Sequence, residues 1–180
     1  MKPKLTLGVS ILIALVLVAF GLVYGNVSGY ADERAHVTAL LEGDGGLETV
    51  LGYRAADGLN LCVIAARHLP DAPETEALRA AAQAVRAGQP TLAALKASDE
   101  ALTVAFKAAA DALRADAGFQ ADARDPHYLE LLDADFTQFG QHAIYATYNK
   151  AAAEFNTSLA KPALGDVARF FGVKPCELFA

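Results

Sequence analysis

The stretch TLAALKASDEALTVAFKAAADALRA, residues 91–115, contains the repeat that decides the fold. Steps of three and four residues place side chains on one face of an α-helix, and their alternation is typical of core positions between antiparallel helices in a bundle. We therefore predict a helix from about Thr91 to Ala115 within an all-α, elongated bundle of three to four helices. Its core residues recur at steps of three, seven, four, three and four: Leu92, Leu95, Leu102, Phe106, Ala109 and Leu113.

Two helices are predicted before this stretch. No sustained alternation of apolar and polar residues indicates a strand, and Ala, Leu, Glu and Arg are prominent. One helix, Leu47 to Leu69, ends at Pro70, and a shorter one, Pro73 to Ala87, begins with an aspartate, a proline and acidic residues in its first turn. The apolar face of the first is formed by Leu51, Leu59, Leu61, Val63 and Ile64.

One long helix is predicted after the stretch. In DPHYLELL we expect Asp125 as the N-cap and Pro126 as the first helical residue. The helix can continue to about Leu159, which corresponds to roughly 50 Å at the rise of an α-helix. Its candidate core residues are Leu132, Phe136, Phe139, Tyr148, Phe155 and Leu159.

Leu5 to Tyr24 is an uncharged apolar segment of twenty residues. A helix of that length rises about 30 Å, the thickness of the hydrocarbon core of a bilayer. A cleaved signal peptide is the alternative, since small residues follow at Gly29 and Ala31, but the apolar region of a signal usually spans only about 7 to 15 residues. We therefore expect an uncleaved anchor over residues 1–25, and a single membrane span.

The distribution of charge around this segment predicts its orientation. Lys2 and Lys4 precede the span, while Asp32, Glu33 and Arg34 are the first charged residues after it. By the positive-inside rule the N-terminus stays in the cytoplasm and the rest of the chain lies outside.

Three glycines interrupt the segment between the anchor and the first main helix. The glycines at 43, 45 and 46 either end a short helix, Asp32 to Leu41, or weaken a longer one. The predicted organisation is thus an anchor over 1–25, a juxtamembrane linker or short helix over 26–46, and a helical bundle over 47–180.

Charge and cysteine content exclude several classes of site. The net charge is −6 and basic residues are scattered, whereas nucleic-acid binding requires a clustered basic face. Cys62 and Cys176 lie in apolar stretches and are expected as small buried residues. A disulfide between them is the alternative if the domain faces an oxidising compartment.

A polar stripe follows the predicted long helix. His142, Tyr145, Asn149 and Asn156 are spaced by three, four and seven residues, and Asn60 lies between two leucines of the first main helix. The stripe is either the solvated edge of the bundle, a set of buried amides that fixes helix register, or a ligand or metal site, with His142 and Tyr145 as the ligand contacts. Because an unpaired buried amide is costly, we expect Asn60 to pair with this stripe.

Catalytic and metal-binding motifs are absent from the sequence. The histidines at 36, 68, 127 and 142 have neither an i, i+4 partner nor the HExxH spacing. No nucleophile is followed by a base, and no phosphate-binding loop is present. We therefore predict a chain that is not an enzyme and has no cofactor or metal. A catalytic or metal site would require His68 or His142 with acidic partners that the fold brings close.

The last 33 residues, YNKAAAEFNTSLAKPALGDVARFFGVKPCELFA, resemble the C-terminal signature of the LemA family of bacterial membrane proteins. That signature has a Tyr-Asn pair, a second aromatic-Asn pair, and an aliphatic run ending in FGF-K-P-x-x-F-F. The segment YRAADGLNLCVIAARHL is similar to the family's first long helix, although the glycines after the span and a missing proline before the asparagine depart from the pattern. The matching residues are Tyr148, Asn149, Phe155, Asn156, Phe171, Gly172, Val173, Lys174, Pro175 and Phe179, with Arg54, Asp57, Asn60 and Leu61 in the earlier segment.

The resemblance implies an antiparallel bundle in which the first and last long helices lie side by side. It makes Asn60 a neighbour of Asn149 or Asn156. After a turn at Pro162 and one helical turn from Val167 to Phe171, the chain would reverse at Gly172 so that the terminal phenylalanines fold back onto the bundle. We call Arg54, Asp57, Asn60, Tyr148, Asn149 and Asn156 the polar seam.

The sequence and the resemblance together predict a membrane-anchored helical scaffold of the bacterial envelope. The family offers no activity to transfer, so the expected partners are other envelope proteins, with the bundle outside the inner membrane. Oligomerisation is compatible with this role. The alternative is an extracytoplasmic ligand-binding sensor, in which a small molecule lies between the helices.

Overall fold

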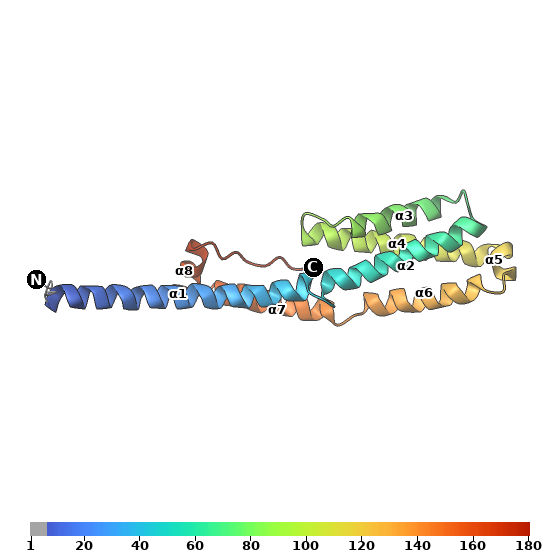
Figure 1. Ribbon diagram of the computed structural model, residues 1–180. Helices are drawn as coiled ribbons and strands as arrows, with labels where there is room; N and C mark the ends of the chain where they lie inside the picture. The colour runs from blue at the N-terminus through green and yellow to red at the C-terminus, as the bar shows by residue number, and fades with distance from the viewer. Residues whose placement is uncertain (1–6) are drawn as a thin grey trace, which may run out of the picture. The chain divides into compact units, whose positions relative to one another are not determined.

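The computed structural model describes residues 7–180, and within this part of the chain every regular element is a helix (Figure 1). The predicted all-α class is confirmed for these residues. Lys2, Lys4 and the start of the expected anchor lie outside the described residues. The helices are α1 (Leu7–Glu42), α2 (Leu47–His68), α3 (Pro73–Arg86), α4 (Leu92–Ala115), α5 (Ala117–Ala121), α6 (Asp125–Gly140), α7 (Ile144–Leu159) and α8 (Leu164–Phe170).

The chain divides into two compact units. Unit 1 comprises Met1–Val37 and Ala151–Cys176, and unit 2 comprises Thr38–Lys150 and Glu177–Ala180. The helix α1 continues past residue 25 without a break and ends at Glu42. The glycines after it form the turn to α2, and Gly45 has a φ of 73°, which favours glycine. The glycines therefore end a helix, but that helix is the whole of α1, and the expected separate short helix from Asp32 to Leu41 is not present.

Unit 2 is a helical bundle around α2. This helix packs against α3, α4 and α6, and α3 also packs against α4 (Figure 1). The predicted bounds of α2, α3 and α4 agree with the structure to within one or two residues. All six core residues predicted from the 91–115 stretch are buried. On α2, in contrast, Val63 is exposed, whereas Leu51, Leu61 and Ile64 are buried as expected.

Gly58 allows three helices of unit 2 to pack closely. A Cβ at this position would lie 3.0 Å from Leu102 Cδ1 and 3.4 Å from Ala82 Cβ. Neighbours at these distances, from α4 and α3, leave almost no room for a side chain. The glycine is therefore a packing requirement in the middle of α2.

The single long helix predicted from Asp125 to Leu159 is wrong, because the chain breaks between α6 and α7. Gly140, a weak helix former, ends α6 against the guanidinium of Arg54. The Nδ1 atom of His142 then accepts the N–H of Ile144 at 3.2 Å, which satisfies a donor at the start of α7. Leu132 and Phe139 are only half-buried, whereas the other four candidate core residues of this stretch are buried.

Unit 1 joins α1 to α7 and α8. The Tyr30 hydroxyl donates to the carbonyl of Ser158 at 2.9 Å, and its ring meets that of Phe155 edge-on at 6.5 Å. Asn26 Nδ2 donates to the carbonyl of Leu164, the first residue of α8, at 2.8 Å. These contacts determine which residues of α1 lie beside the start of α8.

Candidate functional site

A buried charged centre lies inside unit 2, around Arg54 of α2. Its side chain forms an ion pair with Asp99 of α4, and Nη2 donates to Thr103 Oγ1 at 2.8 Å. The guanidinium carbon also lies 4.2 Å from the centre of the Phe136 ring, a cation–π contact. Arg54 is 5% exposed, so a permanent positive charge is held almost entirely out of solvent. We call Arg54, Asp57, Asp99, Thr103 and Tyr145 the arginine centre.

Asp57 lies one turn from Arg54 on the same helix. Burial, together with the charge of Asp135, raises the pKa of Asp57 to about 6, and the charge of Arg54 only partly offsets these effects. The folded chain therefore binds a proton here more readily than the unfolded chain does. The stability contributed by this group falls as pH rises from about 3.8 to about 6.

Tyr145 completes the arginine centre from the first turn of α7. Burial and the charge of Asp99 raise the pKa of Tyr145 to about 12, so its hydroxyl stays protonated at neutral pH. Among the described residues, Arg54 Nε, Asp57 Oδ2 and Tyr145 Oη are buried polar atoms without a hydrogen-bond partner. An unpaired buried polar group costs about 1–3 kcal/mol. The centre thus offers a donor, a carboxylate oxygen and a hydroxyl to water or to a polar ligand.

The predicted polar seam does not form as one cluster. Asn60 is exposed on α2, so its expected pairing with the polar stripe is wrong. The helix turns Asn60 toward solvent because it lies between core positions, with Leu61 fully buried beside it. His142 is exposed as well and caps α7, so only Tyr145 of the two predicted ligand contacts lies in the arginine centre.

The two asparagines of α7 bind the C-terminal segment instead of another helix. In unit 2, Asn149 Nδ2 donates to the carbonyl of Phe179 and Oδ1 accepts its N–H, both at 2.8 Å. In unit 1, Asn156 makes the same pair of bonds to Cys176, again at 2.8 Å each. Each side-chain amide therefore makes the two hydrogen bonds that a neighbouring β-strand would make to one residue of extended chain. We call these two pairs of bonds the amide clamps.

Further contacts hold the last residues within unit 2. The Tyr148 hydroxyl donates to the carbonyl of Glu177 at 2.7 Å, and the Glu177 carboxylate accepts the N–H of Leu92 at 2.8 Å, at the start of α4. The ring of Phe179 lies 5.6 Å from that of Tyr145. The C-terminal residues are therefore held in place by the side chains of α7 that belong to the predicted polar seam, namely Tyr148, Asn149 and Asn156.

The predicted burial of the terminal phenylalanines holds for Phe179 alone. This ring is 6% exposed, whereas Phe170 is 85% and Phe171 57% exposed. The predicted turn at Gly172 is present, with a φ of 92°, and the chain beyond it runs extended through both amide clamps. The turn at Gly172 therefore leads to the burial of Phe179, whereas Phe170 and Phe171, which precede the turn, stay exposed to solvent.

His68 pairs with Asp125 in unit 2. Its Nε2 atom lies 2.7 Å from Asp125 Oδ2, and the other carboxylate oxygen forms an ion pair with Arg67 Nη2 at 3.1 Å. Asp125 is therefore not the expected N-cap of α6. The N-cap is Arg124, which makes no side-chain cap bond, and Asp122 Oδ1 accepts the N–H groups of Arg124 and Asp125 at 2.8 Å each.

The ligand atoms of His68, Asp122 and Asp125 lie within 4.8 Å of one another, a spacing that could hold a metal ion. A cation there would have to displace Arg67 and compete with two backbone N–H groups for these carboxylates. The ion pairs and hydrogen bonds already described give these residues a structural role, because they join the end of α2 to the start of α6. Both cysteines are free thiols in the structure, with Cys62 buried and Cys176 half-buried.

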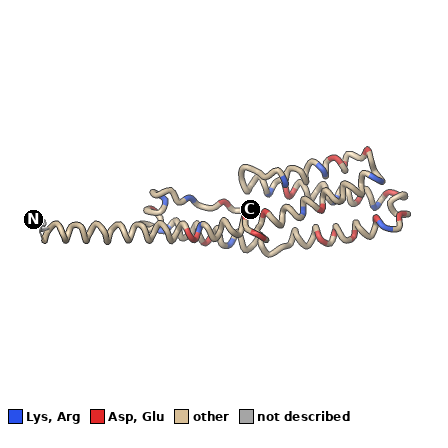
Figure 2. The backbone as a smooth tube through the Cα atoms, in the orientation of Figure 1, with Lys and Arg blue, Asp and Glu red and all other residues tan. Residues whose placement is uncertain are grey.

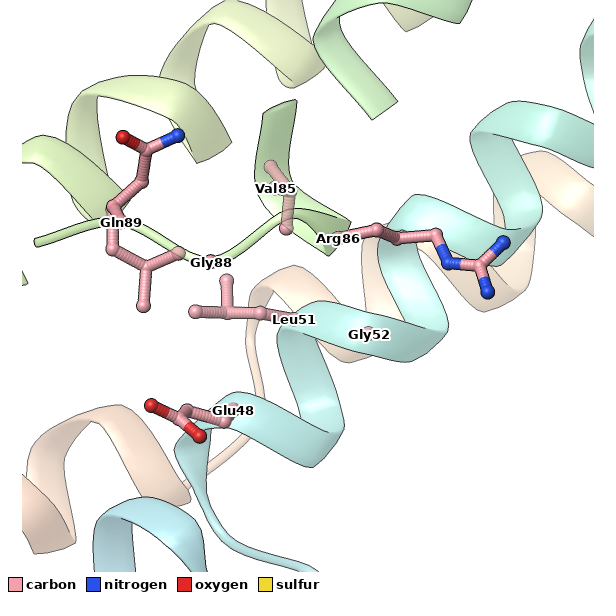
Figure 3. A pocket seen from close by; sticks show the side chains of 8 residues that line it. Glu48, Leu51, Gly52, Val85, Arg86, Gly88 and Gln89 are labelled. Atoms are coloured by element: carbon pink, nitrogen blue, oxygen red, sulfur yellow. The ribbon is translucent and has the colours of Figure 1, made fainter. Parts of the chain in front are cut away.

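A cleft of about 330 Å³ opens on unit 2 between α2, the end of α3 and the start of α4 (Figure 3). Leu51, Val85 and Leu95 form its apolar floor, and Figure 3 shows the side chain of Arg86 directed away from Gln89. Gln89 is held in place by a bond from Nε2 to the carbonyl of Ala84 at 2.9 Å. The volume suits a small apolar group.

Sequence reasoning missed Asp99, the partner of Arg54. The core repeat of the 91–115 stretch steps by seven from Leu95 to Leu102, and the position that a heptad would fill between them is Asp99. A charged residue at a core position requires a buried partner of opposite charge. The aspartate at this position of the apolar repeat was therefore the sequence signal for a buried ion pair.

Comparison with known proteins finds no match among family models, curated proteins or solved structures.

Proposed function

We propose that this chain is a membrane-anchored helical scaffold of the bacterial envelope that binds other envelope proteins and has no catalytic activity. In this proposal it is a LemA-like protein of the inner membrane, with its N-terminus in the cytoplasm and an antiparallel bundle outside. The charge pattern of the sequence supports this orientation.

The observation that carries the proposal is the surface of α1. The helix is long and apolar enough to cross a membrane, and none of that stretch is buried inside the chain. Figure 2 shows no charge along its first part, and the first charged residue is Asp32. Exposed leucine, isoleucine, valine and phenylalanine side chains on one continuous helix are favourable in lipid and costly in water. A signal sequence has the same composition, so the uncleaved anchor is part of the proposal.

The LemA-like architecture draws support from two regions. Arg54 and Asp57, which occupy family positions, lie at the arginine centre. Asn149 and Asn156, which belong to the family's paired signature, form the amide clamps. Short turns between α2, α3 and α4 are compatible with antiparallel neighbours.

The role as a scaffold rests on the outer faces of the helices in unit 2. Large apolar side chains are exposed there, for example Val63 at 63% and Val104 at 71%. An amphipathic helix of a partner protein can pack its apolar face against such side chains.

The proposal can be tested by photo-crosslinking in native membranes. A diazirine-bearing phenylalanine analogue is placed at Val63 or at Val104, and in a control chain at Phe106, which is 2% exposed. We expect reproducible adducts with other membrane or envelope proteins from the two exposed positions, and none from Phe106. If the membrane-inserted chain gives protein adducts from neither exposed position, the proposed role is wrong.

A further inference from the structure

The exposed apolar residues of α8 form a second surface, at the level where the expected membrane span ends. Leu164, Phe170 and Phe171 are 58%, 85% and 57% exposed. The two phenylalanine rings meet edge-to-face at 5.3 Å and so form one aromatic group. Such a group in water is unfavourable, and no described contact of the fold removes it from solvent.

Two hydrogen bonds within unit 1 place this surface along α1. Asn26, whose side chain binds the first carbonyl of α8, lies two residues beyond Tyr24, the end of the expected span. Two helical residues correspond to about 3 Å of rise. Beyond α8, the carbonyl of Lys174 accepts from Arg34 Nε at 3.1 Å, eight residues further along α1. Leu164 therefore lies in the zone just outside the hydrocarbon core, where lipid headgroups extend over several ångströms, whereas Lys174, level with Arg34, lies about 15 Å beyond the end of the expected span.

The charges around α8 fit the same location. Lys161, three residues before the start of α8, is exposed. Arg169 pairs with Asp166 within the helix. Lysine and arginine near a membrane surface are attracted to anionic lipid headgroups by about 1 kcal/mol each. Aromatic rings are likewise favoured at the boundary between lipid and water.

We propose that α8, through Leu164, Phe170 and Phe171, docks on the surface of the same bilayer that α1 crosses. The helix inserts its apolar side chains at the headgroup level, while Lys161 contacts an anionic lipid headgroup. This membrane contact fixes unit 1 relative to the bilayer plane at a second point. The inference rests on the membrane span of the proposed function.

The chain contains no tryptophan, so single tryptophans can report depth in the full-length protein. Three variants, Phe170→Trp, Leu15→Trp and Val63→Trp, are reconstituted into vesicles of phosphatidylcholine and phosphatidylglycerol that contain lipids brominated at defined depths. We expect Leu15→Trp to be quenched by bromines deep in the acyl chains. Phe170→Trp should be quenched by shallow bromines, with at least about half of its fluorescence lost and its emission shifted to shorter wavelength, and Val63→Trp should not be quenched.

The variants separate the two proposals. Quenching of Leu15→Trp without quenching of Phe170→Trp would overturn the docking of α8 and leave the span standing, whereas absence of quenching at both positions would overturn both. A Lys161→Ala form of Phe170→Trp, compared in vesicles with and without phosphatidylglycerol, tests the headgroup contact. Its quenching should no longer depend on the anionic lipid, and an unchanged dependence would contradict the role of Lys161.

Discussion

Arg54 has three different contacts on one guanidinium. Asp99 balances its charge, Thr103 accepts one N–H, and the ring of Phe136 covers one face. A buried ion pair contributes little compared with apolar residues of similar volume, but the loss of one partner leaves the other charge buried alone. The two charges of the arginine centre should therefore depend strongly on each other.

We predict that Arg54→Leu lowers the free energy of unfolding by about 3–5 kcal/mol, because Asp99 is left buried and unpaired. The double variant Arg54→Leu, Asp99→Leu should recover most of this loss. Urea unfolding of the full-length chain in detergent micelles, followed by circular dichroism, measures both. As a control, Arg79→Leu, which removes an exposed pair with Glu76, should change stability by at most about 1 kcal/mol. Additive losses in the double variant would show that the pair is not coupled.

At the scale of elements, close packing around Gly58 determines how the helices of unit 2 approach one another. Atoms of Leu102 and Ala82 are already within 3.0 to 3.4 Å of where a Cβ would lie. Gly52, on the same helix, has no atom within 4 Å of its own Cβ position. The two glycines therefore form a matched pair, one required by packing and one not.

Gly58→Leu should destabilise the chain by about 1–3 kcal/mol or more, since the added side chain overpacks the contact with α3 and α4. Gly52→Leu should be neutral or stabilising by up to about 1 kcal/mol, because a helical glycine is replaced where space is open. Thermal unfolding of the two variants, side by side, gives the comparison. Equal effects at the two positions would contradict the packing described for α2.

Helices with a continuous apolar repeat could be predicted from the sequence. The helix break and the exposed polar residue that interrupt such a pattern could not. The a/d spacing over 91–115 fixed α4 and its buried face, and the proline signals fixed the ends of α2 and α3. The break at Gly140 escaped prediction because an isolated glycine inside a helical pattern is tolerated and does not by itself end a helix. Asn60 was misplaced for a related reason, since local sequence does not tell which side of a leucine-rich helix faces solvent.

At the scale of the whole molecule, several residues of the candidate site could be predicted, but the residues that they contact could not. Arg54 and Asp57 were named through the family resemblance and the asparagines of α7 from their spacing, and each makes specific contacts or has a shifted pKa in its unit. Their partners are a heptad aspartate and the backbone of the C-terminal residues. Such contacts join segments far apart in sequence, and only the folded chain shows them.

We propose above all that α1 crosses a membrane and that the helical unit 2 lies on the side opposite the N-terminus. The most direct test of this proposal is labelling of single cysteines with a membrane-impermeant maleimide in intact cells, in a chain with Cys62→Ala and Cys176→Ala. One variant carries Val104→Cys, 71% exposed on α4, and the other a cysteine inserted after Met1. The account predicts that Val104→Cys reacts in intact cells while the N-terminal cysteine reacts only after lysis. Protection of Val104→Cys until lysis, or recovery of the chain in the soluble fraction, would contradict it.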